Sequence, residues 1–327
     1  MKTNSQVLLC FGILFAAVDL SGCHLFQRRP PVQPIPPAFI NTPTLDQLIA
    51  HIHANTAAVR QLSTKGATLD LDTPGTIIPL LNVDLSLERP KNLRLLASTG
   101  LTGTELDLGS NDELFWFWIK RNDPPTVFYA RHGQFHDSAA KQIFPVEPNW
   151  LIEAIGLVEF NSADRHEGPY LKQDGRLEIR SMHTTATGEE TRVTLIDPKG
   201  GWIVEQHIYD EQGQLLASAF ASRHQRDSAS GAVLPLLIEI RMPPAQLTLR
   251  LDVRSYEINR LYGDPAKLFA LPQLDGHQYV DLADPRLQLT PATAPVPAPT
   301  PAIGTGMQPS TRLQQEPLQR TRGFRPL

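Results

Sequence analysis

Thiol side chains are the rarest reactive groups of this sequence. Its 327 residues contain two cysteines, Cys10 and Cys23. Two thiols can form one disulfide, contribute to a metal site, or act independently of each other. Which of these applies depends on whether the first two dozen residues stay part of the working protein.

One group of histidines has the composition of a metal site. His132 and His136 are four residues apart and Asp137 follows, a set that could bind zinc if the segment were helical. Gly133 and the strand-like residues before it favour a turn instead. The sequence also has no Gly-x-Ser-x-Gly motif, no cysteine nucleophile and no dense carboxylate pair. We therefore predict no metal site, no cofactor, no catalytic residues and no enzymatic activity.

The N-terminus has the layout of a secretory signal. Lys2 is the only charged residue among the first eighteen, and residues 7–18 form an apolar run. This run is too short for the roughly 20 residues that span a bilayer as a helix. The small residues Ser21 and Gly22 follow it, as in a signal peptide. We predict that residues 1–22 are a signal peptide, with a short membrane anchor or a buried helix as the alternative.

Residues 20–23, Leu-Ser-Gly-Cys, resemble the bacterial lipobox. The resemblance implies that the Cys23 thiol receives a diacylglyceryl group and that the amine freed by cleavage is acylated as well. Several acyl chains on one residue give the durable membrane attachment that a single chain does not. Cys23 is thus the predicted lipid anchor, and Cys10 leaves with the signal. Because His24 is not the aspartate that commonly retains such proteins in the inner membrane, we expect the outer membrane, facing the periplasm.

Both flanks of the remaining chain are rich in proline. Residues 24–43 carry six prolines, which favour an extended spacer of about 3.1 Å per residue. Residues 290–327 lack an apolar period and have the composition of a disordered segment. Their arginines fit either a solvated tail or contact with an anionic surface. We predict a lipidated cysteine with a proline-rich tether over 23–43, a folded body over 44–283 and a disordered tail over 284–327.

The body begins with a helix and continues with alternating strands. Thr44 to Gln47 have the pattern of a capping box, and apolar residues then recur at helical spacing. After Gly66 the apolar period changes to two, as in residues 83–87 and 247–253, which suits an antiparallel sheet with one dry face. A second helix is expected near residues 149–157. We predict a mainly β fold of about ten or eleven strands with a few helices against the sheet. The net charge of −4 gives no sign of a nucleic-acid surface.

The segment Leu114–Ile119 (LFWFWI) breaks this alternation because it is apolar on both faces. In a strand, Phe115 and Phe117 point to one side while Trp116 and Trp118 point to the other. Either both faces are covered as ordinary core, or one face lines a cavity, where aromatic rings suit acyl chains. All four aromatic residues are candidate cavity walls, and the broader indoles slightly favour the tryptophans.

Several short motifs of the body resemble the LolA/LolB-like lipoprotein-carrier superfamily. The end of that family has a basic alternating strand, an asparagine, a Phe-x-x-Pro turn, a glycine and a Val-Asp-Leu strand. The matching positions here are Asn259, Phe269, Pro272, Gly276 and Val280 to Leu282. Residues 87–95 and 106–112 resemble earlier runs of the family, so the similarity covers about residues 44–283. Residues 161–200 and the proline-rich tail have no counterpart.

The resemblance implies an unclosed antiparallel β-barrel, covered by a few α-helices, whose hollow holds acyl chains. A lipidated chain is more similar to the outer-membrane receptor of the family than to its soluble carrier, which becomes an expected partner. Receptors use an exposed leucine of an early loop for membrane insertion, and Leu101 is at a comparable position. The expected partners are the membrane, through Cys23, and acyl chains of lipoproteins or lipids, with no nucleic acid. A structural or protein-interaction envelope lipoprotein of the same fold is the alternative.

Overall fold

The computed structural model describes residues 35–73, 78–135, 144–185, 188–284 and 286–287. Cys23, the signal, most of the tether and the tail lie outside these residues, as do His136 and Asp137, so the predictions on them stay predictions. All described residues belong to one compact unit. Within them, no helix is both long enough and apolar enough to cross a bilayer.

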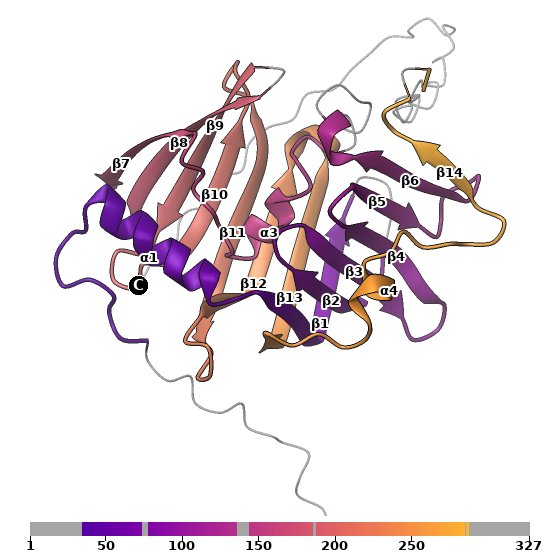
Figure 1. Ribbon diagram of the computed structural model, residues 1–327, viewed down its shortest axis with the longest axis horizontal. Helices are drawn as coiled ribbons and strands as arrows, with labels where there is room; N and C mark the ends of the chain where they lie inside the picture. The colour runs from indigo at the N-terminus through magenta and orange to yellow at the C-terminus, as the bar shows by residue number, and fades with distance from the viewer. Residues whose placement is uncertain (1–34, 74–77, 136–143, 186–187, 285, 288–327) are drawn as a thin grey trace, which may run out of the picture. The chain divides into compact units, whose positions relative to one another are not determined.

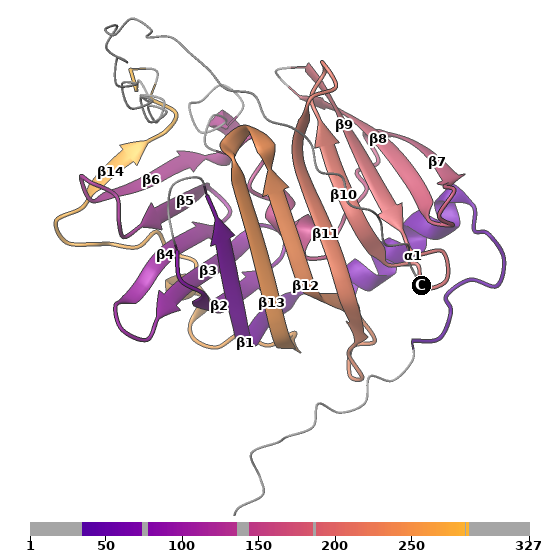
Figure 2. The same ribbon diagram turned by 180° about the vertical axis from the view of Figure 1, so that it is seen from behind.

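A single sheet of fourteen strands dominates the fold (Figures 1 and 2). The strands are β1 (Gln61–Asp72), β2 (Leu81–Glu88), β3 (Asn92–Thr99), β4 (Gly103–Ser110), β5 (Leu114–Ile119), β6 (Thr126–Arg131), β7 (Arg165–Leu171), β8 (Leu177–Thr185), β9 (Gly188–Ile196), β10 (Ile203–Tyr209), β11 (Leu215–Arg226), β12 (Val233–Met242), β13 (Leu247–Ile258) and β14 (Gln278–Asp281). The helices are α1 (Leu45–Ala57), α3 (Trp150–Ala154) and α4 (Pro265–Leu268), with 3-10 turns η1 (His132–Gln134) and η2 (Pro243–Ala245).

The sheet is open. Its order is β14-β6-β5-β4-β3-β2-β1-β13-β12-β11-β10-β9-β8-β7, so β14 and β7 are edges. Neighbours are antiparallel except β14, which runs parallel to β6. The predicted unclosed antiparallel barrel with a few helices is confirmed. The predicted strand number was too low, because residues 161–200 supply three strands with little apolar alternation, and β14 is only four residues long.

Two helices cover the inner face of the sheet. The capping box of α1 is confirmed, since the Gln47 amide donates to Thr44 Oγ1 over 3.3 Å and the Thr44 amide to Gln47 Oε1 over 3.0 Å. Buried Leu48 and Ile52 of α1 pack on apolar residues of β8, β9 and β10. Each such buried side chain stabilises the fold by roughly 1.5–3 kcal/mol. The helix expected near 149–157 is α3.

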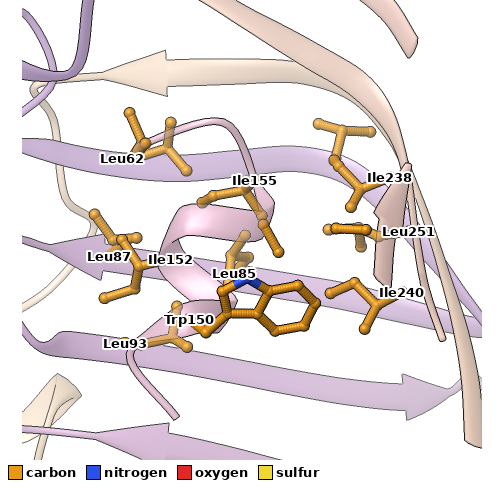
Figure 3. Close-up of a cluster of buried hydrophobic side chains, with 14 of the residues drawn as sticks. Leu62, Leu85, Leu87, Leu93, Trp150, Ile152, Ile155, Ile238, Ile240 and Leu251 are labelled. Carbon is orange, nitrogen blue, oxygen red and sulfur yellow. The ribbon is translucent and has the colours of Figure 1, made fainter. Parts of the chain in front are cut away.

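Helix α3 lies between the two halves of the sheet. Figure 3 shows its Trp150 and Ile152, with Ile155 just beyond, facing leucines of β2 and β3 on one side and residues of β12 and β13 on the other. The residues around α3 include Leu85, Leu87, Leu93, Ile238, Ile240 and Leu251. This short helix is therefore held by burial on several sides, since five residues have almost no helix stability of their own.

Residues 259–284, called here the C-terminal strap, cross the opposite, outer face of the sheet. The guanidinium of Arg94 in β3 donates to the carbonyls of Leu268 and Ala270 over 3.0 and 3.1 Å, and Asn111 Nδ2 donates to Phe269 O over 3.2 Å. The strap ends in β14.

Ala38, in the segment before α1, is also bonded to the folded body. Its amide donates to Lys199 O over 2.6 Å.

Candidate functional site

A cavity of about 230 Å³ lies on the inner face of the sheet, beside α3. It is lined by Leu69, Leu71, Thr73, Ile78, Leu81, Leu85, Leu93, Leu95, Glu105, Leu106, Leu108, Phe117, Ile119, Arg121, Phe144, Leu151, Ile155, Ile238, Ile240, Leu247, Leu249 and Leu251. Nearly all of these side chains are apolar. An engineered cavity of about 150 Å³ with a similar lining stays dry and binds benzene. This cavity has room for a larger apolar group.

The alternation of the sequence builds this wall. Leu85, Leu95, Leu108 and Phe117 stand opposite one another on β2, β3, β4 and β5. Because side chains alternate between faces with a period of two, one residue of each strand reaches the same face at this level. The row is a ladder of apolar side chains across four strands. The far wall comes from β12 and β13, and α3 contributes Leu151.

The phenylalanines of β5 belong to this inner face. Phe117 lines the cavity, and its ring is stacked on Phe128 with centroids 4.9 Å apart. Phe144 meets Phe117 edge-on at 5.3 Å. Phe115 lies one step further along the strand and packs against Phe135 at 5.9 Å. Of the four candidate aromatic residues, Phe117 is therefore the one that lines this cavity.

The tryptophans of β5 lie on the outer face, where Arg94 ties the C-terminal strap to the sheet. Trp116 is fully buried, and its Nε1 donates to Asp107 Oδ1 over 3.3 Å. Gly109 makes room for the ring, because a Cβ on it would lie 2.0 Å from the indole. The ring of Trp118 meets that of His277 at 5.7 Å. The preference for the tryptophans as cavity walls thus differs from what the structure shows, because Phe117 lines the cavity. On the outer face Asp107 gives the buried indole of Trp116 its acceptor, whereas Nε1 of Trp118 is buried without a hydrogen-bond partner among the described residues.

The outer face also carries an ion pair beside Trp116. Arg94 Nη2 lies 2.6 Å from Asp107 Oδ2, and the guanidinium stands over the indole at 5.5 Å. Burial raises the pKa of Asp107, while Arg94 acts in the opposite direction. Asp107 is therefore a structural acceptor that holds Arg94 and Trp116 under the strap.

One end of the cavity opens among exposed apolar residues. The β1–β2, β3–β4 and β5–β6 connections meet at the same end of the sheet, as the strand registers require. Leu80, Leu101 and Ile119 lie at this end and are 62, 98 and 41% exposed. Leu101 is thus at the tip of the β3–β4 turn. Its role in membrane insertion stays a prediction.

A polar group of residues lies on the other side of α3. Glu153 of α3 faces Arg192 of β9, with Nη1 3.5 Å from Oε1, and Gln206 Nε2 donates to Glu153 O over 2.8 Å. Close by, His183 Nδ1 is 2.8 Å from Asp164 Oδ1. Burial raises the pKa of Glu153, and Arg192 lowers it. Sequence reasoning missed this group; the only signal was a series of polar residues at the inward positions of β8 and β9.

His132, one of the two histidines of the candidate metal set, makes a different contact in the structure. His132 Nε2 lies 2.8 Å from Asn111 O, in the 3-10 turn η1 after β6. This turn agrees with the expectation that the segment is not a long helix. Across the ranges that the structure describes, no three His, Cys, Asp or Glu side chains are arranged to hold a metal ion. The other two members, His136 and Asp137, are outside those ranges.

Two solved structures align with about two thirds of this chain. A LolA superfamily protein from Nitrosomonas europaea aligns with 68% of this chain and 97% of its own, at 10% identity and a TM-score of 0.43. A DUF1329 family protein from Desulfovibrio piger aligns with 66% of this chain and 92% of its own, at 12% identity and a TM-score of 0.45. No protein-family model and no curated protein matches the sequence.

At these TM-scores the likeness carries nothing about ligand or activity. What the chain binds has to be inferred from its own cavity.

Proposed function

We propose that this protein is a membrane-anchored bacterial lipoprotein that binds an acyl chain in its inner cavity and takes part in lipoprotein or lipid trafficking at the cell envelope. The apolar cavity supports the proposal: a hollow of about 230 Å³ lined almost wholly by Leu, Ile and Phe side chains. Away from Thr73, Glu105 and Arg121, the lining has no side-chain hydrogen-bond partners, so a polar group buried there would stay unsatisfied. The lining complements a hydrocarbon chain.

The size of the cavity sets what enters it. Ligand pockets commonly measure about 300–1,000 Å³, and this cavity is smaller. It suits one acyl chain or part of one. A lipoprotein with several acyl chains would require α3, which carries Leu151 and closes one side, to move. We therefore propose a single-chain ligand, or one chain of a larger ligand, with the protein as a binding protein and not an enzyme.

The proposed setting follows from the two ends of the site. Cys23 would hold the protein on the outer membrane on its periplasmic side, and the tether would give the body reach. Leu101, 98% exposed at the open end of the cavity, would enter the lipid surface when cargo is passed on. A soluble carrier protein is the proposed source of that cargo.

Probe binding tests the function directly. The full chain with Cys23→Ser, purified without detergent, is titrated with a fluorescent fatty acid and with the neutral apolar dye 1-N-phenylnaphthylamine. We expect saturable binding of both. Leu95→Trp places an indole in the cavity and should weaken binding about tenfold, the equivalent of losing about two buried methylene groups.

Leu171→Trp is the matched control, because Leu171 on the edge strand β7 is 69% exposed. It should leave both titrations unchanged. If the wild-type chain binds neither probe, the proposed transport function is contradicted. The alternative, a structural or protein-interaction lipoprotein, would then replace it.

A further inference from the structure

A bulge in β4 aims a carboxylate at the open end of the cavity. Ala97 of β3 pairs with Leu106, and Ser98 pairs with Thr104, so Glu105 is the extra residue between them. Bulges change the direction of the side chains they carry. Here Glu105 and its neighbour Leu106 both line the cavity, whereas regular alternation would have sent one of them to the outer face.

The Glu105 carboxylate is held by one hydroxyl and two cations. Thr102 Oγ1 donates a short hydrogen bond to Oε1, Lys120 Nζ is 3.5 Å from Oε1, and Arg121 Nε is 3.7 Å from Oε2. The hydrogen bond from Thr102 is the main reason why the pKa of Glu105 is below its usual value, and the two cations add to it. Glu105 therefore stays charged and balances one of the two cations.

The second positive charge is available to a ligand. Arg121 lines the cavity and still keeps 57% of its side chain exposed. Its guanidinium forms no hydrogen bond with any residue that the structure describes, and the ion pair with Glu105 is loose. A guanidinium matches the two oxygens of a carboxylate or a phosphate in a planar, two-bond contact. Lys120 lies beside it with 40% of its side chain exposed.

We propose that Arg121 and Lys120 recognise the anionic headgroup, carboxylate or phosphate, of an amphiphile whose hydrocarbon chain occupies the cavity, and that Glu105 balances one of their two charges. This inference rests on the proposed acyl-chain function. It adds a specificity: the apolar hollow takes the chain, and the group of Glu105, Lys120 and Arg121, with a net charge of +1, takes the head.

Competition between amphiphiles of equal chain length tests this specificity. The neutral dye 1-N-phenylnaphthylamine is displaced from the full chain with Cys23→Ser by dodecanoate, dodecyl phosphate or dodecanol. We expect the anionic competitors to act at about fivefold lower concentration than dodecanol, the upper range for an exposed ion pair. Arg121→Gln should bring the three competitors close to parity.

Two further variants complete the test: one should increase the preference for anionic competitors, and the other should leave it unchanged. Glu105→Gln removes the balancing anion and should widen the preference for anionic competitors. Arg260→Gln is the control, because Arg260 follows β13 at the other end of the sheet and its side chain is 66% exposed; it should change nothing. If Glu105→Gln does not fold, Arg121→Gln and Lys120→Gln, both at partly exposed side chains, carry the test.

The outcomes are distinct for the two proposals. Equal competition by all three amphiphiles in the unaltered cavity would overturn the headgroup inference while leaving acyl binding intact. A chain that does not bind the dye would overturn the proposed function and this inference together. Preference for dodecyl phosphate alone or dodecanoate alone would support it and identify the headgroup as a phosphate or a carboxylate.

Discussion

At the scale of single residues, the two faces of β5 differ in what surrounds them. Trp116 is fully buried and bonded to Asp107, whereas Phe117 borders an open volume on one side. Truncating a fully packed aromatic residue to alanine costs about 3–5 kcal/mol, because the surroundings only partly fill the space. A residue beside an existing cavity has fewer contacts to lose.

We therefore expect Trp116→Ala and Phe117→Ala to separate stability from binding. Trp116→Ala should lower the free energy of unfolding by about 3–5 kcal/mol and leave the dye affinity of the folded fraction unchanged. Phe117→Ala should cost less stability and weaken acyl-probe binding. Urea unfolding and dye titration on both variants measure this. Equal stability losses with unchanged affinities would show that Phe117 is plain core.

The sequence predicted that the residues of β5 alternate between two faces, with either both covered as core or one lining a cavity, but not which face is which. That assignment depends on neighbours distant in the chain. Gly109 and Asp107 of β4 give the indole its space and its acceptor, and Arg94 on β3 joins them to the C-terminal strap. None of these pairings can be inferred from one strand. The role of Glu105 was missed for a similar reason, because it depends on a bulge in the β3–β4 register.

At the scale of elements, α3 separates an apolar space from a polar one. Leu151 faces the cavity, while Glu153 on the same helix meets Arg192 of β9. Other charged groups near Glu153 are Glu147, His183 and Asp164. The helix is five residues long, so its position depends on these contacts and on the packing of Trp150.

Arg192→Leu should destabilise the protein by leaving Glu153 without its partner. Removing one member of a fully buried pair costs about 3–5 kcal/mol. We expect about 2 kcal/mol here, since Arg192 and Glu153 keep 19 and 22% of their side chains exposed. The measurement is the free energy of unfolding in urea at pH 7.

The loss should shrink as the pH falls. Burial raises the pKa of Glu153 above 4.5 in the folded protein, so the folded state takes up this proton at a higher pH than the unfolded chain. The contribution of Glu153 to the free energy of unfolding therefore increases as the pH falls from its raised folded-state pKa towards 4.5, the ordinary pKa of a glutamate. The control is the double variant with Glu153→Gln, which should lack this pH dependence. A loss in Arg192→Leu that is the same at pH 7 and pH 5 would contradict the assignment.

Elements with strong local signals were predictable. The capping box placed the start of α1 correctly, and apolar alternation identified β2 and β13. Strands β7, β8 and β9 were harder, because their inward positions include polar residues such as His166 and Arg192, which face the polar space beside α3. The edge strand β14 overlaps the short strand that the family resemblance implied at Val280 to Leu282, but its parallel pairing with β6 is information that the local sequence does not contain.

At the scale of the whole molecule, the proposed function requires the body to remain near a bilayer. Ile119 and Arg121 line the cavity at the end of the sheet that also carries the exposed Leu101. An acyl ligand that leaves the cavity there avoids water only if it enters another apolar environment. An anchor with several acyl chains would keep the protein at the membrane durably, whereas one acyl chain binds only marginally. The predicted anchor, Cys23, is the one cysteine that would remain after removal of residues 1–22.

Cys23→Ser should therefore release the protein from the membrane without disturbing its fold. A serine hydroxyl does not replace the thiol in diacylglyceryl transfer, so labelling with a radioactive or clickable fatty acid should disappear. Once residues 1–22 are removed, the variant should move from the membrane fraction to the soluble fraction, and its thermal unfolding should match that of the detergent-extracted wild type. Cys10→Ser is the control and should keep both the label and the membrane location. Unlabelled wild-type protein in the soluble fraction would contradict the anchor, and acyl binding would then have to serve a soluble carrier.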